Sequence, residues 1–263
     1  MTCINCQTES DGAYCPACGQ RMEVKRINFK EGWQDFWAHI YGFDGMFPRT
    51  LRDLTIRPGA AARTFIEGNR VAYYGPVGYF FLMITLFLLV LSLLGLDYSD
   101  FLKGAQQSLL IESKDTEAVR LMQRFVADNM KLVAFLAIPF QVITARYIVF
   151  RSSGFNFLEH SVLPFYTMGH QYWLSIVGAV YFSLFGNLIN PLVDTVLTIA
   201  YFAFAYTSFI TSQSKWRSFM KGILVFFISY TMFVAFIVVC VVAWILFIAW
   251  QDPEGLKMFK PTA

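Results

Sequence analysis

The sequence has few charged residues for its length. Asp, Glu, Lys and Arg make up 15% of the 263 residues, and hydrophobic residues make up 56%. Soluble domains carry about 25% charged residues, so this shortage excludes an ordinary soluble protein. The formal net charge of +3 is small and spread along the chain, and it therefore argues against nucleic-acid binding. The composition predicts a protein that exposes much of its apolar surface to lipid.

The short motifs of common catalytic sites are also absent. The sequence contains no H-E-x-x-H, G-x-S-x-G, phosphate-binding loop or paired-acid signature. No internal repeat divides it into two equal halves, as the repeats of many transporters do. These absences favour a protein without catalytic activity.

The sequence has too few cysteines outside its two C-x-x-C motifs to form a disulfide framework. Of its five cysteines, Cys240 lies in an apolar run, and the other four form two C-x-x-C motifs at residues 3–6 and 15–18. Four thiolates in two such turns are typical of a closed tetrahedral Zn²⁺ site with a structural role. Rubredoxin-like iron uses the same ligands, and a thioredoxin-like redox site is less favoured because no βαβ pattern surrounds the motifs. The predicted ligands, within a zinc ribbon over residues 1–22, are Cys3, Cys6, Cys15 and Cys18.

The metal ligands also indicate a compartment. Thiolate-bound zinc requires reduced cysteines, so we expect the N-terminus to lie in a reducing compartment. No basic segment followed by an apolar run precedes the motifs. We therefore expect the first membrane span to serve as an uncleaved signal anchor.

Residues 23–76 are predicted to form amphipathic juxtamembrane helices. The first has apolar residues at helical spacing and polar residues on the other side, including His39, which we interpret as a solvated side chain rather than a metal ligand. Its two tryptophans favour the bilayer interface over packing on the membrane domain. Shorter helices follow at residues 47–54 and after Pro58, and Gly68 suits a helix end. The apolar residues of the first helix are Trp33, Phe36, Trp37, Ile40 and Tyr41.

Five arginines give this segment a positive charge. Asp53 and Glu67 are the acids closest to them. The arginines fit the ordinary excess of basic residues on cytoplasmic flanks, and they also fit contact with anionic lipid headgroups or with a phosphate-bearing ligand at helix N-termini. This set, which we call the basic collar, consists of Arg49, Arg52, Arg57, Arg63 and Arg70.

Four motifs follow one another in the first part of the chain. They are the C-x-x-C…C-P-x-C-G ribbon, Thr50-Leu51-x-Asp53-Leu54-x-x-Arg57-Pro58-Gly59, Ile66-x-Gly68-x-Arg70-Val71-x-Tyr73 and Pro76-x-Gly78-Tyr79-Phe80. In this order they resemble a bacterial family of multipass membrane proteins classed as a domain of unknown function. The resemblance covers residues 1–96, and beyond them the likeness is one of topology alone. It implies a place in the bacterial inner membrane and supplies no activity or catalytic residues.

Long apolar runs predict five membrane-spanning helices. About 20 apolar residues cross the hydrocarbon core, and five such runs occur in residues 77–251, with a helical loop at residues 97–131 and a short tail at residues 252–263. We therefore predict an all-α polytopic membrane protein with a small N-terminal zinc ribbon. The predicted spans are Val77–Leu96, Leu132–Phe150, Val162–Phe185, Pro191–Thr211 and Gly222–Trp250.

An odd number of spans places the two termini on opposite sides of the membrane. The spans put 14 Lys and Arg residues on the side of the N-terminus and 7 on the other side. Because basic residues accumulate on the cytoplasmic side, the N-terminus is predicted in the cytoplasm and the C-terminus outside. The loop at residues 97–131 is then external, where it either covers exposed helix ends or acts as a lid.

A few polar residues fall inside or beside the predicted spans. A polar group in the hydrocarbon zone is costly unless it is hydrogen-bonded or faces water. These residues therefore either bond the helices to one another or line a polar path. Pro139 and Pro164 are expected to kink the helices beside them. The residues are Gln141, Arg146, His170 and Gln171, with Tyr172 next to the last of them.

We interpret the sequence as that of a non-catalytic inner-membrane protein with an adaptor, assembly or regulatory role. Its ribbon and basic collar would dock a protein partner, its lipid contacts would be anionic, and homo-oligomer formation is left open. The alternative is a transporter or lipid-handling protein with a polar path inside the bundle. A lipid-modifying enzyme that uses Glu159, His160 and His170 near the interface ranks last, because no motif supports it.

Overall fold

The chain divides into two compact units in the computed structural model, Met1–Gly45 and Met46–Ala263. The structure describes residues 1–3, 6–9, 11–18, 46–69, 72–96, 125–186 and 190–251. The predicted amphipathic helix around Trp33, Arg70 of the basic collar, most of the predicted loop at 97–131 and the tail at 252–263 lie outside these residues. Each unit is considered by itself below.

The N-terminal unit contains a short hairpin around the first cysteine pair. Thr2 and Glu9 form an antiparallel β-bridge, and the backbone N–H of Cys3 donates to the carbonyl oxygen of Thr8 at 3.0 Å. The N–H of Gln7 donates back to the carbonyl of Cys3 at 2.9 Å, which closes the turn. Gln7 has a φ of 61° in this turn, a conformation that costs energy for a residue with a side chain.

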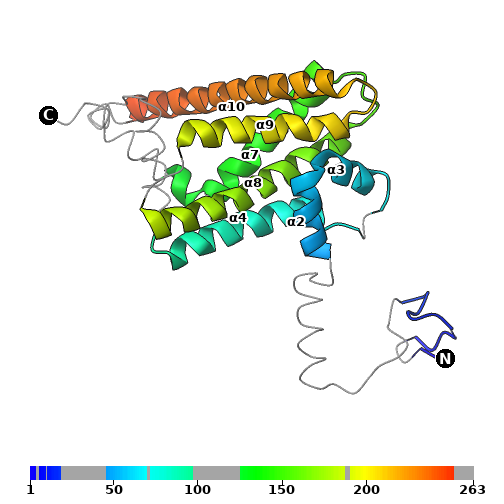
Figure 1. The fold of residues 1–263 in the computed structure, drawn as a ribbon. Helices are drawn as coiled ribbons and strands as arrows, with labels where there is room; N and C mark the ends of the chain where they lie inside the picture. Colours follow the sequence, from blue (N-terminus) through cyan, green and yellow to red (C-terminus); the bar gives the residue numbers. More distant parts are fainter. Residues whose placement is uncertain are drawn as a thin grey trace. The chain divides into compact units, whose positions relative to one another are not determined.

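The second unit, which we call the membrane unit, is built from helices (Figure 1). Several begin with a proline in the first turn, where a missing N–H costs nothing. The last and longest helix begins at Lys215, so the basic segment before the predicted fifth span is helical. In chain order the elements are α2 (Met46–Ile56), α3 (Pro58–Ile66), α4 (Pro76–Leu93), α7 (Met130–Ile143), the π-helix η1 (Thr144–Val149), α8 (Phe157–Phe185), α9 (Pro191–Phe209) and α10 (Lys215–Gln251).

Within the residues that the structure describes, four helical segments are long and apolar enough to cross a membrane: Pro76–Leu93, Met130–Val149, Leu192–Phe209 and Lys215–Ala243. They overlap four of the five predicted spans, as a multipass membrane protein requires. The remaining predicted span, 162–185, lies in α8. This helix has 29 residues, but it is not among the four, and the polar His170 and Gln171 lower the hydropathy of its middle.

Helix ends follow the local sequence. At the start of α8, the side chain of Asn156 accepts from the N–H of Glu159, and the Glu159 carboxylate accepts from the N–H of Asn156, which forms a capping box. The helix ends at Gly186, whose φ is 70°, a conformation that glycine adopts without strain. Pro139 lies inside α7, and the helix continues into the wider π-turns of η1 five residues later.

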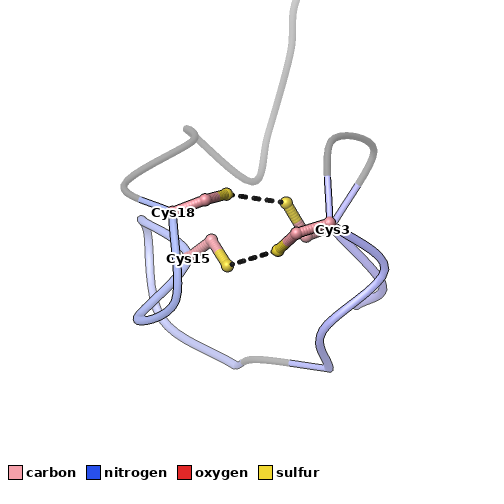
Figure 2. Close-up of side chains that lie close together, drawn as sticks. Cys3, Cys15 and Cys18 are labelled. Carbon is pink, nitrogen blue, oxygen red and sulfur yellow. Dashed lines mark hydrogen bonds between the residues drawn. The ribbon is translucent and has the colours of Figure 1, made fainter.

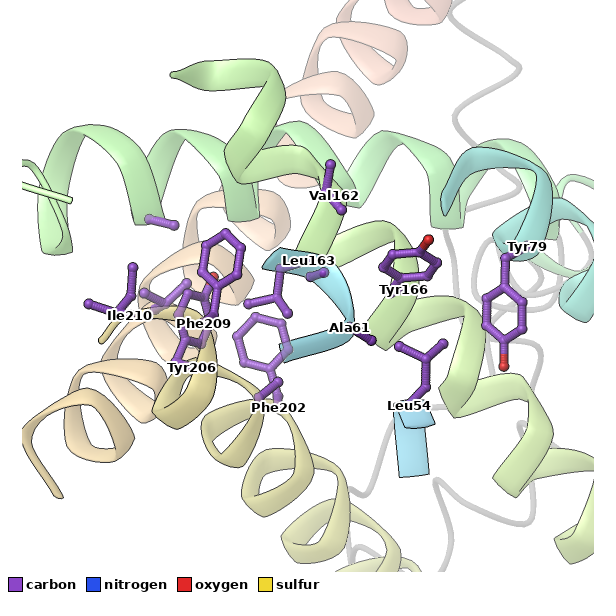
Figure 3. Packing of buried hydrophobic residues seen from close by; sticks show 14 of the residues in the cluster. Leu54, Ala61, Tyr79, Val162, Leu163, Tyr166, Phe202, Tyr206, Phe209 and Ile210 are labelled. Atoms are coloured by element: carbon purple, nitrogen blue, oxygen red, sulfur yellow. The ribbon is translucent and has the colours of Figure 1, made fainter. Parts of the chain in front are cut away.

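The core of the membrane unit is aromatic and lies between α8, α9 and the two short helices (Figure 3). Glycines let the helices approach at backbone distance. A Cβ on Gly59 of α3 would lie 2.0 Å from the carbonyl oxygen of Ala205 in α9, and one on Gly222 of α10 would lie 2.8 Å from the Cα of Ala203. Such contacts replace the hydrophobic driving force that is missing between helices in lipid. They fix α3 and α10 on opposite sides of α9.

Candidate functional site

The four cysteines of the ribbon lie close enough together to bind one metal ion. The Sγ atoms of Cys3 and Cys18 are 3.6 Å apart, those of Cys6 and Cys15 are 3.4 Å apart (Figure 2), and all four lie within 4.8 Å of one another. A tetrahedron with Zn–S bonds of about 2.3 Å has sulfur atoms roughly 3.8 Å apart. The arrangement therefore fits Zn²⁺ or iron.

The surroundings of the cysteines favour the metal-binding form. Hydrogen bonds with Thr8, chiefly with its side chain and also with its backbone, lower the pKa of the Cys6 thiol to about 6. The thiolate is the form that binds metal. Cys3 and Cys15 are buried, whereas Cys6 and Cys18 are exposed. Four protein ligands leave no open coordination position, so a metal bound here would have a structural role.

A second cluster of polar contacts, which we call the polar junction, joins α2 to the rest of the membrane unit. It was not predicted from the sequence. It contains three groups of buried contacts, which centre on Asp53, on Thr50 and on His170. Its members are Thr50, Asp53, Leu54, Thr55, Tyr73, Tyr74, Tyr79, Tyr166, His170 and Tyr201, with Arg52 and Arg57 at its outer edge.

Asp53 is the buried acid of the junction. Its carboxylate accepts from the Tyr73 hydroxyl at 2.8 Å, from Arg52 Nε at 2.9 Å and from an Arg57 terminal nitrogen at 2.9 Å. Burial alone would raise the pKa of Asp53, but the hydrogen bonds from Tyr73, Arg57 and Arg52 outweigh it and hold the pKa below its ordinary value. Burial and the bond to Asp53 raise the pKa of Tyr73. Asp53 is therefore an anion that binds two arginines of the basic collar.

Thr50 connects α2 to the loop before α4. Its side chain, fully buried, donates to the carbonyl of Met46 at 2.7 Å and accepts from the backbone N–H of Tyr74 at 2.9 Å. The carbonyl of Tyr74 in turn accepts from the Tyr166 hydroxyl of α8 at 2.7 Å. The loop is thus hydrogen-bonded to α2 on one side and to α8 on the other.

His170 of α8 lies beside the C-terminal end of α2, and both of its ring nitrogens have hydrogen-bond partners. Nε2 lies 3.1 Å from the Thr55 hydroxyl, and Nδ1 lies 3.0 Å from the Tyr79 hydroxyl. The Thr55 hydroxyl donates its one hydrogen to the carbonyl of Leu51 at 2.8 Å, so it accepts from His170. The proton of the neutral ring is therefore on Nε2, and Tyr79 donates to Nδ1. The ring also stacks on Tyr201 at 5.4 Å, whose hydroxyl donates to the carbonyl of Leu54 at 3.0 Å.

The other predicted intramembrane residues have partners on different elements. Gln171 donates to the Thr198 hydroxyl of α9, and Gln141 donates to the sulfur of Met168 at 3.5 Å. Arg146 donates to the carbonyl of Arg151 at 2.9 Å. In the described part of the chain, no side-chain hydrogen bond joins any two of Gln141, Arg146, His170 and Gln171.

Two of the three residues in the enzyme hypothesis, Glu159 and His160, have structural partners at the start of α8. Glu159 belongs to the capping box described above. His160 is buried, and its Nε2 lies 2.7 Å from the Ser153 hydroxyl. His170 is more than two helical turns away along α8 and belongs to the polar junction. These three residues have separate structural partners.

Comparison with known proteins gives a family match without an activity. Residues 44–88 match the family model described as "Protein of unknown function (DUF3667)". The matched segment covers less than half of the chain and contains α2, α3 and most of α4, including Asp53, Tyr73 and Tyr79 of the polar junction. It agrees with the family resemblance drawn from the sequence motifs. No curated protein and no solved structure matches the chain.

Proposed function

We propose that this chain is a non-catalytic membrane protein whose zinc ribbon docks a protein partner, in an adaptor, assembly or regulatory role. The observation that carries the proposal is the polar junction. Its buried polar groups, which catalysis or transport would require to be free, are engaged in fixing α2 and α3 to the bundle. The membrane unit then serves as a rigid support at the membrane, and the ribbon is the part that makes contact with other molecules.

The environment of His170 supports this proposal over a polar transport path. Its imidazole is buried between three helices, and each ring nitrogen has a single partner within the protein. A proton added to Nδ1 would force the Tyr79 hydroxyl to become an acceptor and leave the hydroxyl hydrogen without its present partner. The arrangement favours one fixed protonation state rather than proton exchange with a substrate.

The ribbon has the features of a protein-binding module. Its four-sulfur donor set leaves no position for a substrate, and Tyr14 exposes 64% of its surface beside the second cysteine pair. The first 18 residues contain no Lys or Arg and two acids, Glu9 and Asp11. This charge disfavours nucleic acid and anionic lipid as partners of the ribbon. An exposed aromatic side chain on a small rigid module is typical of protein interfaces.

The test is affinity purification of the full-length protein from its own cells with quantitative mass spectrometry. A Cys15→Ser, Cys18→Ser variant removes two of the four ligands, and Cys240→Ser is the matched control because it changes a cysteine outside the ribbon. We expect co-purified proteins to be lost at least tenfold with the double variant and retained with the control. Identical sets of co-purified proteins from all three forms would contradict the proposal.

We propose further that α8 is a fifth span and that the α2–α3 end of the bundle faces the cytoplasm. Six other elements pack against α8, namely α2, α3, α4, α7, η1 and α9, and a helix segment that packs against protein tolerates polar residues that a lipid-facing segment does not. A cysteine introduced at Ser108 should react with an impermeant thiol reagent in intact cells, and one at Ser214 should not. The reverse pattern would refute this orientation.

A further inference from the structure

Basic residues of the membrane unit gather at one end of the bundle. This is the end where α4 and α10 begin, where α7 and η1 end, and where α2 and α3 pack (Figure 1). Of the ten Lys and Arg residues that the structure describes in this unit, only Lys131 lies at the other end of α7. The remaining nine are Arg49, Arg52, Arg57, Arg63, Arg146, Arg151, Lys215, Arg217 and Lys221.

Asp53 holds two of these arginines in fixed positions. Arg52 and Arg57 bind its two carboxylate oxygens, yet their side chains keep 63% and 57% of their surface exposed. Each guanidinium has five N–H donors. Arg52 donates one hydrogen bond from Nε to Asp53 and has a terminal nitrogen 2.9 Å from the same carboxylate oxygen, and Arg57 donates one hydrogen bond from a terminal nitrogen. Asp53 therefore fixes the orientation of both guanidinium groups, and most of their N–H donors do not contact it.

Arg63 provides an internal contrast within the basic collar. Its Nε and one terminal nitrogen donate to the carboxylate of Glu67, and its other terminal nitrogen donates to the Thr211 hydroxyl. Its side chain is only 28% exposed. All three nitrogens of Arg63 are thus engaged, and its contacts attach α3 to the segment after α9.

Aromatic and apolar side chains at the same end indicate the depth of the bilayer interface. Trp216 exposes 69% of its surface at the start of α10, Tyr147 exposes 53% on η1, and Ile56 exposes 62% at the end of α2. Tryptophan and tyrosine favour the headgroup region, where an apolar ring and a polar edge are both accommodated. The exposed guanidiniums of α2 and of Arg57 lie at the end of the bundle that carries this belt.

We propose that Arg52 and Arg57, together with the exposed Arg49, bind the phosphate of an anionic lipid headgroup. Planar guanidinium groups match phosphate oxygens in pairs, and Asp53 orients the pair before a lipid arrives, which lowers the entropic cost of binding. The buried acid thus has two tasks: it anchors α2 through Tyr73, and it orients the lipid-binding arginines. Arg63 has no part in this site.

The experiment measures phosphatidylglycerol binding to the delipidated full-length protein by native mass spectrometry. We expect the Arg52→Gln, Arg57→Gln variant to weaken phosphatidylglycerol binding by roughly tenfold or more, because each arginine near an anionic headgroup contributes on the order of 1 kcal/mol. Arg63→Gln and Lys131→Gln are the controls and should bind as the unmodified protein does. Phosphatidylcholine, which carries no net charge, should bind weakly and equally to all forms.

A charge-conserving variant separates orientation from charge and guards against misfolding. Arg52→Lys, Arg57→Lys keeps both positive charges but loses the paired donors, so its binding should fall between that of the unmodified protein and that of the glutamine variant. If the glutamine variant does not fold, the lysine variant still tests the site. Binding that is unchanged in a folded glutamine variant, or lowered as much by Arg63→Gln, would overturn the proposal. Displacement of the lipid by millimolar inorganic phosphate would also overturn it, in favour of a soluble phosphate ligand.

Discussion

The ribbon and the membrane unit are held together in different ways. Among the ribbon residues that the structure describes, only Cys3 and Cys15 are buried, so the sulfur cluster takes the place of a core. The membrane unit has a large aromatic core, glycine contacts between helix backbones and the polar junction. A small module of the first kind depends on its metal, whereas helices in lipid satisfy their own backbone groups. The comparison predicts that each unit can be disrupted without the other.

The largest expected effect is loss of the metal. Cys15→Ser with Cys18→Ser leaves two thiolates where four are required, so stoichiometric zinc should fall from about one per chain to none in elemental analysis. The ribbon should then unfold, because the metal supplies most of its stability. The thermal midpoint of the membrane unit should stay within about 2 °C of that of the unmodified protein. A large drop in that midpoint would show that the two units are not independent, and absence of metal from the unmodified protein would contradict the site itself.

Disruption of the membrane unit should be most severe where backbones touch. In Gly59→Ala the new methyl group would lie 2.0 Å from the carbonyl oxygen of Ala205 and 2.4 Å from the backbone nitrogen of Phe209. Neither backbone atom can move away cheaply, so we expect a loss of about 3 kcal/mol in the free energy of unfolding, or separation of α3 from α9. Zinc content should not change.

Gly75→Ala is the matched control for this change. It lies just before α4 with a φ of −57°, and a Cβ there would have nothing within 4 Å. Its free energy of unfolding should change by less than about 0.5 kcal/mol. Equal losses in the two variants would mean that glycine flexibility, and not the α3–α9 contact, determines the effect.

Features with a local or additive signal could be predicted from the sequence. The cysteine ligands follow from a spacing of a few residues, and four spans follow from length and apolar content. The start of α3 at Pro58 and the turn at Gly68, whose φ is 109°, follow from the properties of single residues. The third predicted span shows the limit of apolar content as a signal. Its polar residues lower the hydropathy of α8, and the neighbouring helices that stabilise them lie far away in the sequence.

The polar junction could not be predicted because its partners are far apart in the chain. Thr55 and His170 are separated by 115 positions, and Leu54 and Tyr201 by 147. In the sequence alone, Asp53 is only an acid near five arginines. The spacing of four between Asp53 and Arg57 is a local hint of an ion pair, but the hydrogen bond from Tyr73, 20 positions away, has no local signal.

Asp53 should contribute more stability than an exposed ion pair of similar geometry. Asp53→Asn keeps one acceptor oxygen but places an NH₂ group against one of the guanidiniums, so we expect a loss of about 1 to 3 kcal/mol. Glu67→Gln is the control, since Glu67 is 58% exposed and pairs with Arg63 at the same spacing. Its loss should not exceed about 1 kcal/mol. Unfolding of the detergent-solubilised protein measures both, and equal losses would contradict a special role for the buried acid.

The lowered pKa of Asp53 predicts that the free energy of unfolding depends on pH. Since the pKa of Asp53 is lower in the folded protein than its ordinary value, its stabilising effect is complete above about pH 4 and is lost as the pH falls through the folded-state pKa. The free energy of unfolding should therefore decrease on acidification below about pH 4. Asp53→Asn should reduce this slope, and Glu67→Gln should leave most of it. A slope that is the same with and without Asp53 would assign the acid sensitivity to other carboxylates.

The smallest expected effect comes from two tyrosines of α9, the half-buried Tyr201 and the buried Tyr206. Tyr201 donates to the carbonyl of Leu54 and so belongs to the polar junction, whereas the hydroxyl of Tyr206 is buried with no partner among the described residues. Tyr201→Phe should lower the free energy of unfolding by about 1 kcal/mol, because it leaves a helix-end carbonyl without its donor. Tyr206→Phe removes a hydroxyl that already lacks a partner, so its effect should be neutral or stabilising. Equal losses in the two variants would mean that packing alone holds α2 against α9. The hydrogen bonds of the polar junction would then not stabilise the membrane unit in the way that metal is expected to stabilise the ribbon.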